Sequence, residues 1–266
     1  MPESNGYVDV VCVDAMKTVF EWEDAEAPFQ LYADAADRQV TTAFKNSLCR
    51  TLRARRREFL NDDEDIETYW RKVNVAVLGD MNQRLGESEK ETRSQTIRRT
   101  ITSDTALYVV RDDMRNAMER LSEFCHQHGW WLVLASNQNQ QVLANMVSTF
   151  GLGDVFDKQY TPTNLGAHKP SLGFWYAIRG YGVVSKRILA MFGNSLENDA
   201  VAAKVPIQVF LHDRTGGRAR VLAKMPGTTD LPDWVYRRRD RGLIKIYSDP
   251  ASFVDEPMEL LGEKYA

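Results

Sequence analysis

The chain has 266 residues and a formal net charge of −3, with 43% hydrophobic and 27% charged residues. This length and composition predict a globular protein with a substantial core, arranged as one large domain or two smaller ones. The small negative charge provides no overall attraction to nucleic acid, so we interpret the basic runs at 50–57 and 237–241 as solvated surfaces. Nucleic acid is therefore not an expected partner.

The three cysteines, Cys12, Cys49 and Cys125, lie far apart and form no C-x-x-C pair. This spacing favours neither a disulfide framework nor a zinc site. No apolar run approaches the roughly 20 residues of a membrane helix, and the first residues lack the pattern of a signal peptide. We expect a cytoplasmic protein without a membrane span, and its oligomeric state is not predicted.

The first expected element is a buried strand at 8–13, which ends at Asp14. From about 21 to about 105, apolar residues instead recur every three or four positions, which predicts helices. We expect one long amphipathic helix from about Phe29 to near Leu60, a second from about Asp65 to Leu85, and a third, weaker helix or a mobile connection over 86–100. A long coiled-coil arm is the alternative for this region.

After residue 105, apolar runs that end in polar residues alternate with helical patterns such as 114–128, where Gly129 is the expected residue after the helix. The segment 226–241 is turn-rich and is expected to cross the surface. The alternation predicts an α/β fold with a doubly wound, Rossmann-like parallel sheet. Ligands of such sheets bind beyond the carboxyl ends of the strands. The expected strands after the first lie at 131–135, 188–192, 207–211 and 243–247.

Polar residues at two of these strand ends, and Lys169 in the segment between 135 and 188, have a chemical interpretation of their own. A short carboxylate at Asp14, held by a buried strand, is positioned for nucleophilic attack, although the alternative is a helix N-cap. Ser136 and Asn137 follow the strand at 131–135, where such a pair is ordinarily a turn or cap. Lys169 precedes a proline and would offset negative charge, but a Lys-Pro pair is ordinarily a surface loop.

Taken together, four signals resemble the motifs of the haloacid dehalogenase-like (HAD) hydrolase superfamily in order, spacing and context. They read VVCVDAMKTVF around Asp14, LVLASNQ around Ser136, AHKP around Lys169 and GNSLENDAVAAK from Gly193. The resemblance implies a Rossmann-like core formed by 1–20 and 106–266, with a helical cap at 21–105 inserted after the first strand. It also implies catalytic roles for Asp14 as nucleophile and for Thr18, Ser136, Asn137, Lys169 and Asp199.

This sequence departs from the family pattern near the nucleophile. Met16 stands where the family has a second carboxylate, Lys17 replaces a glycine, and Asn194 replaces the aspartate of a Gly-Asp pair. The loss of an acid at Met16 removes proton transfer that typically contributes about 10²–10⁴ in rate. The implied metal positions are Asp14, Met16, Asn194 and Asp199, with Mg²⁺ weakly held by the Asp14 carboxylate, a backbone carbonyl and the Asn194 amide oxygen.

These departures leave three interpretations of the function. In the first two, the chain is a HAD-like hydrolase that attacks a small phosphorylated or halogenated substrate through Asp14. The first is a hydrolase that does not need the missing carboxylate, such as a dehalogenase, and the second is a phosphatase with reduced or altered chemistry, acting on a substrate whose leaving group needs little protonation. Dehalogenation suits the missing acid, but the tyrosine and asparagine of the family's dehalogenases are replaced here by Trp175 and Leu196. The third is a degenerate member that binds a ligand or a partner without turnover.

Overall fold

The computed structural model describes residues 7–59, 65–182, 184–205, 207–213 and 233–265. The chain divides into two compact units, one formed by Met1–Glu21 with Val110–Ala266 and the other by Trp22–Val109. Each unit encloses a hydrophobic core of its own. In the described part of the chain, no helix combines the length and the apolar character that crossing a membrane requires.

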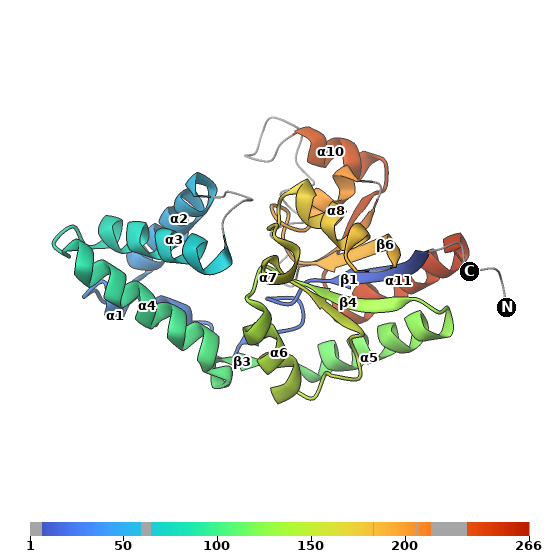
Figure 1. Cartoon of the computed structure of the whole chain (residues 1–266), viewed down its shortest axis with the longest axis horizontal. Coiled ribbons are helices and arrows are strands. Elements are labelled where there is room, and N and C mark those ends of the chain that lie inside the picture. Colours follow the sequence, from blue (N-terminus) through green and yellow to red (C-terminus); the bar gives the residue numbers. More distant parts are fainter. Residues whose placement is uncertain (1–6, 60–64, 183, 206, 214–232, 266) are drawn as a thin grey trace. The chain divides into compact units, whose positions relative to one another are not determined.

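The first unit contains a six-stranded sheet in the order β5-β4-β1-β6-β7-β8, and all of its strand pairs are parallel. This arrangement confirms the predicted doubly wound sheet. The strands β4 and β5 lie on one side of β1, and the later strands β6, β7 and β8 lie on its other side. The strand order therefore reverses between β1 and β6 (Figure 1). The strands are β1 (Tyr7–Val13), β4 (Trp131–Ala135), β5 (Lys158–Tyr160), β6 (Ser185–Gly193), β7 (Gln208–His212) and β8 (Ile244–Tyr247).

Helices cover both faces of this sheet (Figure 1). Helices α5 (Asp112–Gln127) and α11 (Pro250–Tyr265) pack together on one face, and α8 (Leu172–Gly180) packs against β6 on the other. Successive residues of β4, β6 and β7 are buried almost without interruption, as expected for parallel strands whose two faces are both covered. Gly129 follows α5 with a φ of 69°, as predicted for the residue after that helix. The remaining helical elements are α6 (Gln140–Thr149), α7 (Pro162–Leu165), the 3-10 helix η2 (Ala200–Lys204) and α10 (Asp233–Asp240).

The second unit is helical, and its core is formed by buried residues of α1 to α4, among them Tyr32, Leu48, Val73 and Ile97. A two-stranded sheet of β2 and β3 lies where the chain enters and leaves the unit. The elements are β2 (Glu21–Trp22), α1 (Ala27–Ala35), α2 (Thr42–Glu58), α3 (Ile66–Met81), α4 (Glu87–Ser103), the 3-10 helix η1 (Thr105–Leu107) and β3 (Tyr108–Val109).

The predicted single helix from Phe29 to Leu60 is wrong, because the chain turns between α1 and α2. Asp37 has a φ of 54°, which a right-handed helix does not accommodate. The Thr41 hydroxyl then accepts a hydrogen bond from the Phe44 N–H (3.1 Å) and caps the start of α2. The apolar period continues across the turn because both helices bury residues in the same core.

Two other segments differ from the sequence-based expectations. The segment 86–100, predicted as a weak helix or a mobile connection, lies almost entirely in α4, which buries Ser94, Ile97 and Arg98. Residues 233–240 of the expected turn-rich segment form α10, and the part before residue 233 lies outside the described residues. Both helices are rich in charged residues, so their apolar periodicity is weak.

Candidate active site

Five of the predicted site residues meet beyond the carboxyl ends of β1 and β6, where the strand order reverses. The Asp14 N–H donates to the Phe192 carbonyl (2.7 Å) and so continues the pairing of β1 with β6 by one residue. A doubly wound sheet places its ligand site at this kind of reversal. We call the group the Asp14 cluster, and it consists of Asp14, Thr18, Lys169, Asn194 and Asp199, all buried.

Lys169 joins the two carboxylates of the cluster. Its Nζ donates to Asp14 Oδ1 (2.5 Å) and to Asp199 Oδ1 (2.8 Å), and the Lys169 side chain is only 2% exposed. Burial disfavours the charged ammonium, but the two carboxylates outweigh burial and raise the pKa of Lys169 above its usual value. Lys169 is therefore a fixed positive charge within the site.

Asp14 has an altered acidity for a related reason. Burial raises the pKa of Asp14 to about 7, and the negative charge of Asp199 adds to this effect, whereas Lys169 opposes it. A carboxyl group with this pKa is ionised in a large fraction of molecules near neutral pH. Asp14 is therefore available as a nucleophile without an additional base to activate it.

Backbone groups hold the second carboxylate of the site. Asp199 Oδ2 accepts hydrogen bonds from the N–H groups of Asn194 (3.0 Å) and Ser195 (2.9 Å). Gly193 leaves the space for this carboxylate, because a Cβ added at Gly193 would lie 2.4 Å from Asp199 Oδ2. The φ of Gly193 is not positive, so close packing against Asp199, and not the backbone conformation, is what requires glycine here.

We expect Gly193→Ala to destabilise the protein by about 1–3 kcal/mol, because the added methyl group must displace the buried Asp199 carboxylate. Urea unfolding measures this loss. Gly153→Ala is the matched control, since a Cβ there meets nothing within 4 Å. Equal midpoints for the two variants would contradict the close packing of Gly193 against Asp199.

Asn194 directs its amide nitrogen, and not its amide oxygen, at the neighbouring oxygen atoms. Asn194 Nδ2 lies 2.5 Å from the Met16 carbonyl oxygen, 3.0 Å from Thr18 Oγ1 and 3.5 Å from Asp14 Oδ2. The Met16 carbonyl can only accept hydrogen bonds, and so can an ionised Asp14, which determines the orientation of the amide. The predicted use of the Asn194 oxygen as a metal ligand therefore disagrees with the structure.

The arrangement does not fit Mg²⁺, which prefers oxygen ligands, especially carboxylates, in near-octahedral geometry. Lys169 donates to Asp14 Oδ1 and to Asp199 Oδ1, the backbone N–H groups of Asn194 and Ser195 donate to Asp199 Oδ2, and the Asn194 amide nitrogen faces Asp14 Oδ2 at 3.5 Å. The Met16 carbonyl accepts from the Asn194 amide. Among the described residues, no group of three or more histidine, cysteine, aspartate or glutamate side chains has the arrangement of a metal site.

Asn137 holds the backbone of Lys169, whereas the Ser136 hydroxyl bonds within its own loop. The Asn137 side chain pairs with the backbone of Lys169, donating to its carbonyl (2.7 Å) and accepting from its N–H (2.8 Å), so it positions the lysine. Ser136 ends β4, and its hydroxyl accepts from the Gln138 N–H (3.2 Å). Ser136 makes no hydrogen bond to the Asp14 cluster within the described part of the chain.

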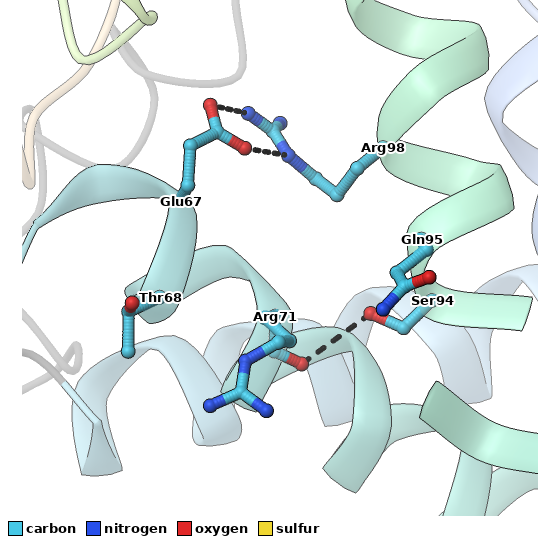
Figure 2. A pocket seen from close by; sticks show the side chains of 6 residues that line it. All are labelled: Glu67, Thr68, Arg71, Ser94, Gln95 and Arg98. Atoms are coloured by element: carbon cyan, nitrogen blue, oxygen red, sulfur yellow. Dashed lines mark hydrogen bonds and ion pairs between the residues drawn. The ribbon is translucent and has the colours of Figure 1, made fainter. Parts of the chain in front are cut away.

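A second candidate site lies in the helical unit, where a pocket of about 250 Å³ opens between α3 and α4 (Figure 2). Its two arginines are already paired, Arg98 with Glu67 (2.9 Å) and Arg71 with Glu91 (2.9 Å). Figure 2 shows the Arg71 guanidinium apart from the Glu67–Arg98 pair. The buried Ser94 hydroxyl in its lining donates to the Arg71 carbonyl (3.4 Å), and the lining contains no lysine to pair with its carboxylate, so the Asp14 cluster is the better candidate. The pocket is lined by Glu67, Thr68, Arg71, Ser94, Gln95 and Arg98.

Comparison with solved structures identifies the fold as that of the haloacid dehalogenase-like hydrolases. The Bacillus subtilis protein YfnB, assigned as a HAD-hydrolase and solved with magnesium bound, is 14% identical with a TM-score of 0.64 over 96% of this chain and 99% of that chain. L-2-haloacid dehalogenase from Xanthobacter autotrophicus is 16% identical with a TM-score of 0.59, over 97% of this chain and 100% of that chain. A HAD phosphatase from Thermococcus onnurineus is 18% identical with a TM-score of 0.50, over 94% and 97%.

At the level of sequence, no protein-family model matches the chain and no curated protein matches it. The likeness to the solved structures, at 14 to 18% identity for the three proteins described, is a likeness of fold. The function must therefore be inferred from the residues of the site.

Proposed function

We propose that this chain is a hydrolase that attacks a small organic substrate with the Asp14 carboxylate, forms an ester intermediate and releases a leaving group that needs no proton, such as a halide. The observation that carries this proposal is the Asp14 cluster, in which Lys169 donates to Asp14 Oδ1 at 2.5 Å. Because Lys169 donates to Oδ1, the atom that attacks is Asp14 Oδ2, which has a long contact to Asn194 (3.5 Å).

The charge of the site favours a substrate with little negative charge. When Asp14 is ionised, as nucleophilic attack requires, the carboxylates of Asp14 and Asp199 and the ammonium of Lys169 leave a net charge of about −1 at the site. A phosphate dianion would add about −2 close to the nucleophile without a divalent cation to offset it. The Lys17 side chain is exposed, so solvent and salt screen its contribution. A neutral or singly charged substrate meets less repulsion.

The residue at position 16 also selects the leaving group. A thioether has no proton to give, so Met16 cannot protonate an alkoxide as it departs. A halide departs as a stable anion together with the bonding electron pair, while the bond from Asp14 Oδ2 to the substrate carbon forms. Water then hydrolyses the ester and Asp199 accepts its proton, so that the products are an alcohol, a halide and a proton.

A phosphorylated substrate with an acidic leaving group is the second candidate. The fold is shared with a HAD phosphatase as well as with dehalogenases, and Trp175, where the dehalogenase pattern has a tyrosine, is fully buried in the core. A third candidate is ligand binding without turnover, which the combined changes at Met16, Lys17 and Asn194 favour. We also propose that the helical segment 21–105 serves as a cap domain that selects the small-molecule substrate.

Halide and phosphate release measured in parallel test these candidates. We expect the wild-type protein to release halide from 2-chloro- or 2-bromopropionate at the same rate in EDTA and in Mg²⁺, because the site does not require a divalent cation. Phosphate release from p-nitrophenyl phosphate without halide release would favour the second candidate. Silence in both assays would overturn the proposal in favour of ligand binding.

A further inference from the structure

We infer that the side-chain amide of Asn194 replaces a divalent cation in this site, so that the identity of residue 194 decides whether the site binds Mg²⁺. Asn194 Nδ2 lies among three oxygen atoms that come from different positions of the chain, Asp14 Oδ2, the Met16 carbonyl oxygen and Thr18 Oγ1. Oxygen atoms that converge on one point in this way would otherwise attract a small cation.

The amide is held firmly in this position. Asn194 is 6% exposed, and its own N–H donates to Asp199 Oδ2 (3.0 Å), which anchors the backbone at the end of β6. The two shorter contacts of Nδ2, to Met16 and Thr18, use the two hydrogens of the amide. A cation that bound the Met16 carbonyl and Asp14 Oδ2 would have to displace this amide group.

The charge of the cluster leads to the same conclusion. Lys169 is shared by two carboxylates. The remaining oxygen of Asp199 accepts from two backbone N–H groups, and the remaining oxygen of Asp14 faces the neutral Asn194 amide at 3.5 Å. An aspartate at position 194 would keep the shape of the side chain but place a third carboxylate against Asp14 and the Met16 carbonyl. That arrangement lacks donors and is relieved by a divalent cation. The exchange of an NH₂ group for an oxygen therefore switches the site between the two states.

Asn194→Asp is the variant that tests this inference, with Mg²⁺ alone as the ligand. We expect wild-type protein to show no saturable heat of Mg²⁺ binding and the same unfolding midpoint in EDTA and in Mg²⁺. Asn194→Asp should unfold at a lower temperature in EDTA and recover in Mg²⁺, with an affinity for Mg²⁺ at least about tenfold above wild type.

Two further variants separate a specific site from a general effect of charge. Asn198→Asp adds the same charge in the same loop, where the Asn198 backbone N–H donates to Ser195 Oγ (3.0 Å). It should bind Mg²⁺ no better than wild type. Asn194→Ser removes the amide without adding charge, and it should gain Mg²⁺ binding that is weaker than that of Asn194→Asp. This second variant also serves if Asn194→Asp fails to fold in EDTA.

Two outcomes would overturn the inference. The first is wild-type protein that binds Mg²⁺ as tightly as Asn194→Asp. The second is an Asn194→Asp variant whose Mg²⁺ affinity and unfolding midpoint match those of Asn198→Asp. Because these measurements use no substrate, a failure of the proposed hydrolase activity would leave the cation inference standing, and a failure here would leave Asp14 as the proposed nucleophile.

Discussion

Asp14→Asn should lower kcat by roughly 10⁴-fold or more, because an amide cannot replace a carboxylate nucleophile. The substitution keeps the shape of the side chain, and Lys169 keeps its ion pair with Asp199 Oδ1 (2.8 Å), so the variant should fold. The initial rate of halide release measures the effect. Turnover in heavy-oxygen water should also place a heavy oxygen in the wild-type peptide that contains Asp14, because water cleaves the ester at the Asp14 carbonyl carbon.

Asp9→Asn is the control for this prediction. Asp9 lies on the same strand and pairs with Arg187 through two hydrogen bonds of 2.6 Å each. It precedes Asp14 by five residues, or roughly 16 Å of extended chain, so it lies toward the other end of β1. This variant should keep the wild-type rate. An Asp14→Asn protein with the kcat of Asp9→Asn would exclude Asp14 as the nucleophile.

Lys169→Met should destabilise the protein by about 3–5 kcal/mol near neutral pH, because it leaves the buried carboxylates of Asp14 and Asp199 without a counter-charge. Urea unfolding measures the change. Lys186→Met is the control, since Lys186 is also buried but, among the described residues, donates to the carbonyls of Tyr181 and Val184 and to no carboxylate. Its loss should be smaller. A Lys169→Met loss no larger than that of Lys186→Met would contradict the stabilising role of this ion pair.

The loss in Lys169→Met should also depend on pH. The pKa of Asp14 is about 7 in the folded wild-type protein, above the usual value for aspartate, and removal of Lys169 raises it further. A raised folded-state pKa means that the folded state binds more protons than the unfolded chain, so stability falls as pH rises through that range. The variant should therefore be less impaired near about pH 5 than near about pH 8. A loss that is constant across this range would contradict the prediction.

Much of the sheet follows from local sequence. A parallel strand that is buried on both faces needs a continuous apolar run, such as 131–135, whichever strands lie beside it. Such runs can therefore be recognised in the sequence alone. Strand β5 was not predicted, because it has three residues and begins with the exposed Lys158. The turn between α1 and α2 was also missed, since both helices bury apolar residues in one core and the period alone does not reveal a break.

The candidate site likewise has features that follow from the sequence and features that follow only from the tertiary structure. The sequence by itself determined the doubly wound fold and the candidate Asp14, because strand ends are local features, and the resemblance of its motifs to those of the HAD superfamily implied Lys169 and Asp199. Only the tertiary structure decided how those residues meet. Hydrogen-bond partners far apart in sequence determine which atom of an amide faces which oxygen, as Met16 and Thr18 do for Asn194. The sequence therefore predicted a weak magnesium ligand where the folded chain has a hydrogen-bond donor.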